Sequence, residues 1–195
     1  MHDGYKVGPY WNKIPGFEIR APCTICGTDE TMEHILTECS APGQSQIWNL
    51  ASTLWEGKKT DWTPPSFANV LACGLTQIKD EKGMTLRGES RLYRIIVSES
   101  AYLIWKLRNE RVINDRAPTA PAEIQNRWIA TINHCLSQDC LLTNPKYGSK
   151  TIKESKVKET SQGTLWDEEN LSSDWNRKSR VLVGIRPCIV RQGMG

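Results

Sequence analysis

The sequence predicts a mainly α protein in three parts: a small cysteine-bearing unit over residues 1–42, a helical bundle over 43–142 and a disordered basic tail over 143–195. Three observations support this prediction. Cysteine and histidine recur at short spacing near the N-terminus, apolar residues recur at helical spacing through the middle, and periodicity is lost after residue 143. The chain of 195 residues is long enough for one compact domain followed by a tail.

The N-terminal unit contains the pattern C-x2-C-x7-H-x4-C, formed by Cys23, Cys26, His34 and Cys39. Three thiolates and one imidazole complete a tetrahedral set for Zn²⁺, and a closed set leaves no position for water or substrate. We therefore predict a zinc knuckle with a structural Zn²⁺, in which Gly27 supplies the backbone freedom that the turn needs. The alternative is that four unrelated reduced residues fall at this spacing by chance.

The second pair of ligands, His34 and Cys39, is predicted at the end of a short helix. Thr28 or Asp29 is placed to cap that helix, and the acidic residues near its first turn suit the positive end of the helix dipole. Five residues correspond to about 140° around an ideal α-helix. The helix is therefore expected to end or unwind before Cys39.

The other cysteines, at positions 73, 135, 140 and 188, are predicted to be free thiols in a reducing compartment. The N-terminus lacks the apolar run of a secretory signal, and no apolar stretch approaches about 18 residues. We expect an intracellular protein, nuclear or cytoplasmic, without a membrane span. His134, Cys135 and Cys140 lack a fourth ligand at suitable spacing, so ordinary packing is preferred to a second metal site.

Helices are predicted on both sides of a long central one. Residues 44–55 form an amphipathic helix because their apolar residues share one face: Ile47, Leu50, Ala51, Leu54 and Trp55. A shorter helix is predicted to follow Pro64-Pro65-Ser66 and to continue through Val70 to Leu75. A further helix is predicted from about Ala120 to Leu142, with apolar residues again at helical spacing.

The longest predicted helix covers about residues 89–115 and has two adjoining apolar stripes. One stripe holds Leu92, Ile96, Leu103 and Leu107, and the other holds Tyr93, Val97, Ala101 and Ile104. This apolar surface is wider than one packed face requires. The helix is therefore expected at the centre of a bundle or in contact with a second copy of the chain, which would make a homo-oligomer.

The tail is predicted from composition alone. Residues 146–158 are rich in Lys, Ser and Thr, and residues 161–179 are polar with two isolated tryptophans, Trp166 and Trp175. Such a composition buries too little apolar surface to offset the conformational entropy of the chain, so we predict disorder over 143–195. Residues 180–185 are a candidate for a short strand or a docking segment.

The net charge of +3 is unevenly distributed. Residues 1–145 hold 15 Lys and Arg against 16 Asp and Glu, whereas residues 146–195 hold 10 against 6. The loop 23–39 contains four acidic residues and no Lys or Arg, so any contact with phosphates has to come from residues outside it. The candidates for nucleic-acid contact are basic and aromatic: Lys6, Tyr10, Trp11, Lys13, Arg20, Arg87, Arg91 and Arg94. The alternatives are aromatic packing over the metal loop and a solvated arginine face.

Several segments together resemble a known family. They are Lys6-Val-Gly8-Pro-Tyr-Trp11 with Ile14-Pro15, Cys23-x2-Cys26, and Glu30-Thr-Met-Glu-His34-Ile-Leu-x-x-Cys39. This arrangement resembles the reverse-transcriptase-associated zinc-binding region near the C-terminus of non-LTR, LINE-like retrotransposon polyproteins. The helices containing Ile47-Trp48 and Ser98–Arg111 resemble the C-terminal helical extension of the fungal versions. The resemblance covers about residues 5–142.

This resemblance implies an endonuclease, a reverse transcriptase and often a ribonuclease H upstream of the region. The present sequence contains no paired-aspartate polymerase signature and no four-carboxylate set for two Mg²⁺ ions. It is therefore expected to be the distal part of such a polyprotein or a remnant of one. The upstream polymerase and ribonuclease H parts become candidate partners.

Two functions remain open at this point. The first is a non-enzymatic zinc-binding module that binds RNA or DNA, as the metal motif and the resemblance suggest. The second is a protein–protein interaction module with a purely structural zinc, favoured by the acidic loop and the wide apolar helix. An enzyme is not expected, because no nucleophile–base constellation recurs at a suggestive spacing.

Overall fold

The computed structural model describes residues 5–59, 61–177 and 183–185. Over these ranges the protein is mainly α, as predicted, and extended pairing is limited to isolated bridges at Pro22–Asp29, Lys79–Thr85 and Leu165–Val183. None of the helices in this part of the chain is long and apolar enough to cross a membrane.

The α-helices of the described residues are the four that were predicted, in the predicted order, and one more in the segment predicted to be disordered. They are α1 (Gln44–Glu56), α2 (Phe67–Leu71), α3 (Arg87–Val112), α4 (Pro121–Leu142) and α5 (Glu154–Ser161). The short 3₁₀ turns are η1 (Gly8–Lys13), η2 (Glu18–Arg20), η4 (Cys73–Leu75), η5 (Pro145–Lys150), η6 (Glu168–Asn170) and η7 (Trp175–Arg177), and η3 (His34–Glu38) is a π-helix. The predicted second helix is therefore divided into two elements. The α-helix α2 ends at Leu71, and the separate 3₁₀ turn η4 covers the remaining predicted residues up to Leu75.

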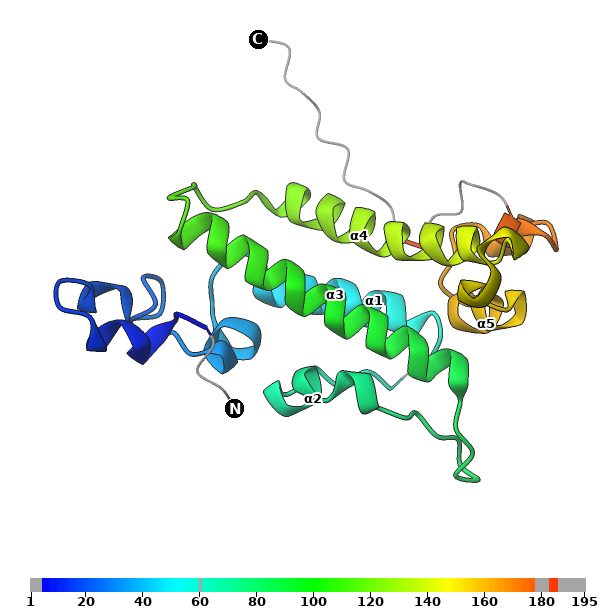
Figure 1. The fold of residues 1–195 in the computed structure, drawn as a ribbon, viewed down its shortest axis with the longest axis horizontal. Coiled ribbons are helices and arrows are strands. Elements are labelled where there is room, and N and C mark those ends of the chain that lie inside the picture. The colour runs from blue at the N-terminus through cyan, green and yellow to red at the C-terminus, as the bar shows by residue number, and fades with distance from the viewer. Residues whose placement is uncertain (1–4, 60, 178–182, 186–195) are drawn as a thin grey trace, which may run out of the picture.

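Helix α3 is the central element of the bundle. It packs against α1, α2, α4 and α5, and Figure 1 shows it crossing the molecule with the N-terminal unit at one end and α5 at the other. Ile96 and Val97, one from each predicted stripe, are both fully buried. A buried hydrogen bond from Trp128 Nε1 in α4 to Ser100 Oγ in α3, 2.9 Å long, fixes these two helices together. The apolar width of α3 is thus accounted for within one chain.

Part of the segment predicted to be disordered is folded. Helix α5 packs against α3 and α4, and Val157 is fully buried beside Leu136, Leu165 and Trp175. The contact between α5 and α3 is close: a Cβ added at Gly88 would lie 2.2 Å from the carbonyl oxygen of Glu159. The composition argument was wrong over these residues because a few apolar side chains suffice when they dock on helices that are already formed.

The end of the tail is only partly described. Val183 is buried, pairs with Leu165 in an isolated bridge, and donates its N–H to Asn133 Oδ1 at 2.8 Å. This places residue 183 of the predicted docking segment against α4. Residues 178–182 and 186–195, which include Cys188 and most of the remaining tail, lie outside the described residues.

Candidate metal centre

The first two candidate ligands lie on a tight turn. The Thr28 carbonyl accepts a hydrogen bond from the Cys23 N–H at 2.7 Å, and the Cys23 carbonyl accepts one from the Gly27 N–H at 2.8 Å. Gly27 has a φ of +72°, a conformation that a residue with a side chain rarely adopts. The role predicted for this glycine is confirmed, and the turn brings Cys23 and Cys26 to the same side.

The other two ligands lie at the two ends of η3. The helix is started by Thr31, whose hydroxyl accepts a hydrogen bond from the His34 N–H at 3.0 Å. This is a correction to the prediction, which placed the cap at Thr28 or Asp29. The Cys39 N–H then donates to the His34 carbonyl at 2.7 Å, so the helix widens into a π turn before it ends.

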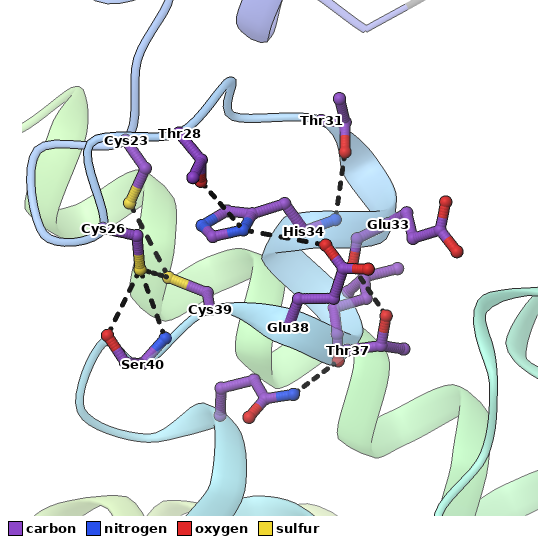
Figure 2. A network of polar contacts seen from close by, with 12 residues as sticks. Cys23, Cys26, Thr28, Thr31, Glu33, His34, Thr37, Glu38, Cys39 and Ser40 are labelled. Atoms are coloured by element: carbon purple, nitrogen blue, oxygen red, sulfur yellow. Dashed lines mark hydrogen bonds and ion pairs between the residues drawn. The ribbon is translucent and has the colours of Figure 1, made fainter.

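The four side chains converge as the spacing predicts (Figure 2). One ligand atom from each of Cys23, Cys26, His34 and Cys39 lies within 4.8 Å of all the others, so this group could hold a metal ion. The Cys39 Sγ lies 3.7 Å from the Cys23 Sγ and 3.8 Å from the Cys26 Sγ. Cys23, His34 and Cys39 are buried, and Cys26 is half-buried.

The imidazole of His34 is oriented for coordination. Its Nδ1 faces the Thr28 hydroxyl at 3.4 Å and the Glu38 carboxylate at 3.9 Å. Its Nε2 is buried and has no hydrogen-bond partner among the described residues. A ligating histidine normally donates its second ring nitrogen to a neighbouring oxygen, which leaves the other nitrogen for the metal.

The thiols differ in their environments. Ser40 lowers the pKa of Cys26 to about 6, because its hydroxyl and its N–H both contact the Cys26 sulfur. Burial raises the pKa of Cys39 to about 12. In the metal-free protein the buried Cys39 thiol therefore keeps its proton, and a metal that binds all three sulfurs has to displace it.

The metal loop is attached to the bundle at two places. Glu30 and Arg108, both buried, form an ion pair that joins the loop to α3. The Leu36 carbonyl accepts a hydrogen bond from Trp48 Nε1 of α1 at 2.9 Å. This pair was not predicted from the sequence, because periodicity alone does not show which polar residue of a helix meets a buried partner.

The N-terminal candidates for nucleic-acid contact lie together on the metal-binding unit. The guanidinium carbon of Arg20 lies 5.3 Å from the ring centroid of Trp11 and 5.0 Å from that of Phe17. Tyr10 makes an edge contact with Trp11 at 5.4 Å. Lys6 is exposed, and Lys13 lines a groove of about 480 Å³ with Tyr10, Met32 and Phe67 among its walls.

The predicted arginine row of α3 is not one exposed surface. Arg87 is exposed at the start of the helix, but Arg91 donates to both carboxylate oxygens of Asp139, at 2.5 and 2.7 Å. Arg94 donates to the Thr76 carbonyl at 3.3 Å. Two of the three arginines are engaged inside the fold, where they connect α3 to its neighbours.

Residues 5–59, 61–177 and 183–185 contain no second cluster of metal-binding side chains, and His134 is exposed on α4. Comparisons with protein-family models, with curated proteins and with solved structures each find no match to this chain. The resemblance to the retrotransposon region stays a prediction that rests on the residues themselves.

Proposed function

We propose that this chain is a non-enzymatic module that binds single-stranded nucleic acid through an aromatic–basic surface. In this proposal a structural Zn²⁺ stabilises the N-terminal unit that carries the surface. The aromatic–basic surface consists of Lys6, Tyr10, Trp11, Lys13, Phe17 and Arg20. The observation that carries the proposal is the position of the Arg20 guanidinium over two aromatic rings on the unit that also holds the metal ligands.

The ligand geometry supports Zn²⁺ as the metal. Two thiolates bound tetrahedrally at a Zn–S distance of about 2.3 Å lie about 3.8 Å apart. The separations from Cys39 to Cys23 and Cys26 have this value within 0.1 Å, and His34 Nε2 offers the fourth ligand. A set of four protein ligands leaves no open position, so the ion stabilises the loop and does not act on a substrate.

The aromatic–basic surface supports nucleic acid as the ligand. Bases stack on exposed aromatic rings, and a guanidinium beside such rings contacts the phosphate or stacks as well. The exposed acidic side chains of the loop, Asp29, Glu33 and Glu38, repel phosphates, so any phosphate contact has to come from the basic residues of the aromatic–basic surface. Because Arg91 and Arg94 are bound to Asp139 and to the Thr76 carbonyl, the proposed contact between the protein and the nucleic acid is confined to a few phosphates.

The resemblance to the reverse-transcriptase-associated region supports the same proposal. In that setting the chain is the distal part of a retrotransposon polyprotein, and its nucleic acid is the template or product of the upstream polymerase. The polymerase and ribonuclease H parts are then its proposed protein partners.

The test is a titration of the full chain with single-stranded RNA and DNA at 50 and 200 mM salt. Neutralising about three phosphates on a single strand predicts a slope near −2 in a plot of log affinity against log salt. The double variant Trp11→Ala with Arg20→Gln should lose most of the binding. Arg177→Gln, which removes an exposed arginine of the tail, is the matched control. Absence of binding at 50 mM salt, or binding that salt leaves unchanged, would rule out this function.

A second candidate, a protein–protein interaction module, is favoured by exposed apolar side chains on the same unit. Ile19 is 83% exposed and Ile25 is 46% exposed. If protein is the partner, binding to the upstream polymerase parts should be insensitive to salt and should be lost in Ile19→Ser with Ile25→Ser. The nucleic-acid proposal expects that variant to bind RNA and DNA as before.

A further inference from the structure

The three sulfur atoms of the candidate metal centre differ in how far solvent reaches them. Cys23 is 1% exposed and Cys39 is 6% exposed, whereas Cys26 is half-buried. Figure 2 shows the Cys26 sulfur beside Ser40, an exposed residue whose hydroxyl oxygen lies 3.2 Å from that sulfur. A small polar reagent in the solvent therefore reaches the Cys26 sulfur before it reaches the other two.

The Cys39 sulfur lies directly beside this accessible sulfur. The Sγ atoms of Cys26 and Cys39 are 3.8 Å apart. A disulfide bond is about 2.05 Å long, so an approach of about 1.8 Å joins the two atoms. The backbone hydrogen bonds of the knuckle turn join Cys23 to Thr28 and to Gly27, so a rotation of the Cys26 side chain towards Cys39 leaves them in place.

We propose that the candidate metal centre is also a redox-sensitive switch, in which hydrogen peroxide oxidises Cys26, Cys39 closes a disulfide with it and the metal is released. An accessible cysteine next to a second, resolving cysteine is the arrangement that peroxide-sensing cysteines share. The disulfide removes two of the four ligands and leaves Cys23 and His34, which are too few to retain the ion. In a reducing compartment such a disulfide is transient, so the switch returns to its starting state.

The reaction has two steps, and both sulfurs start as thiolates because cysteine binds a metal in that form. The Cys26 thiolate attacks one oxygen of hydrogen peroxide: an S–O bond forms, the O–O bond breaks and hydroxide leaves. The Cys39 thiolate then attacks the Cys26 sulfur of this sulfenic acid: the S–S bond forms, the S–O bond breaks and a second hydroxide leaves. Each hydroxide takes a proton from solvent. Two thiolates thus lose two electrons in total, and one peroxide is reduced to two waters.

The experiment exposes the full chain, loaded with Zn²⁺, to a small molar excess of hydrogen peroxide. A chromogenic chelator measures the released Zn²⁺, the remaining thiols are alkylated, and the protein is then cleaved after glutamate. This cleavage puts Cys23 and Cys26 on one peptide, residues 19–30, and Cys39 on another, residues 39–56. A disulfide between Cys26 and Cys39 joins the two peptides and leaves Cys23 alkylated. One joined pair should form for each Zn²⁺ released, and dithiothreitol with added Zn²⁺ should reverse both changes.

The same measurement contains its own control and its contrary outcomes. Cys73, half-buried like Cys26 but outside the cluster, should remain available for alkylation. In Cys39→Ala the second step is blocked, so dimedone, a trap for sulfenic acids, should label Cys26. A disulfide from Cys23 to either of the other two ligands, or release of Zn²⁺ without a joined pair, would overturn the proposal. The joined pair is read by mass alone, so this result is independent of whether the chain binds nucleic acid.

Discussion

The Cys39 N–H donates to the His34 carbonyl oxygen at 2.7 Å, across five residues. In an α-helix these two residues would point about 140° apart. The π turn stacks them instead, and both side chains then face the knuckle that carries Cys23 and Cys26 (Figure 2). The wide turn is a condition for assembling the ligand set and not a defect in the helix.

The first prediction concerns metal content. The purified chain should contain close to one Zn²⁺, and Cys26→Ser or Cys39→Ser should reduce this content strongly because each removes one of four ligands. Elemental analysis after gel filtration measures it. Cys73→Ser, which changes a half-buried cysteine outside the cluster, should keep one equivalent. A fully loaded Cys26→Ser protein would disprove the site.

The second prediction concerns the buried pair of Glu30 and Arg108. Arg108→Met leaves the Glu30 carboxylate buried without its partner and should lower the free energy of unfolding by about 3–5 kcal/mol. Adding Glu30→Gln should recover much of this loss, because the uncompensated charge is then gone. Urea denaturation of both single variants and the double variant measures the coupling. Additive effects of the two substitutions would show that the pair does not interact.

The third prediction concerns α5. Val157→Ala removes two buried methyl groups and should lower the free energy of unfolding by about 1–2 kcal/mol. Limited proteolysis should accordingly leave residues 154–161 intact in the wild-type protein and cut them more readily in the variant. Lys153→Gln, outside the helix on its exposed flank, is the control and should behave as the wild type does. Early cleavage within α5 of the wild-type protein would count against the packing described.

The fourth prediction concerns pH. Two hydrogen bonds from Arg127, each 2.7 Å long, lower the pKa of Glu110. A lowered pKa in the folded state stabilises the protein above the ordinary pKa of the carboxyl group, and this contribution disappears as the pH falls through the folded-state value. Glu110→Gln should therefore be less stable than the wild type by about 0.5–1 kcal/mol at pH 7, and the difference should shrink as the pH is lowered towards 3. Urea midpoints at both pH values measure the difference. The exposed Glu81→Gln should show no such convergence.

Local patterns in the sequence were enough to predict several features. Apolar periodicity located α1, α3 and α4 to within a few residues, and the Cys/His spacing identified all four side chains that converge. Both signals come from residues close together in the sequence. At such short range the spacing of residues determines which side chains lie on the same side of the backbone.

Pairings between distant residues could not be predicted in this way. Arg108 pairs with Glu30, 78 residues away in the sequence, and Arg91 pairs with Asp139, 48 residues away. Periodicity shows on which side of a helix an arginine lies but not which carboxylate another element brings there. The folded part of the tail was missed for the same reason, since α5 depends on the surface of α3 and α4 and hardly on its own composition.

The separation of Glu30 from Arg108 along the sequence also affects the order in which the two parts of this contact become available during synthesis. A ribosome adds Cys39, the last of the four candidate ligands, 69 residues before it adds Arg108. During that interval the metal loop can bind its ion. The Glu30 carboxylate stays in water, because Arg108, which pairs with it, has not yet been synthesised. If the loop binds its metal as proposed, it can do so before it docks, and α3 then meets a preformed surface.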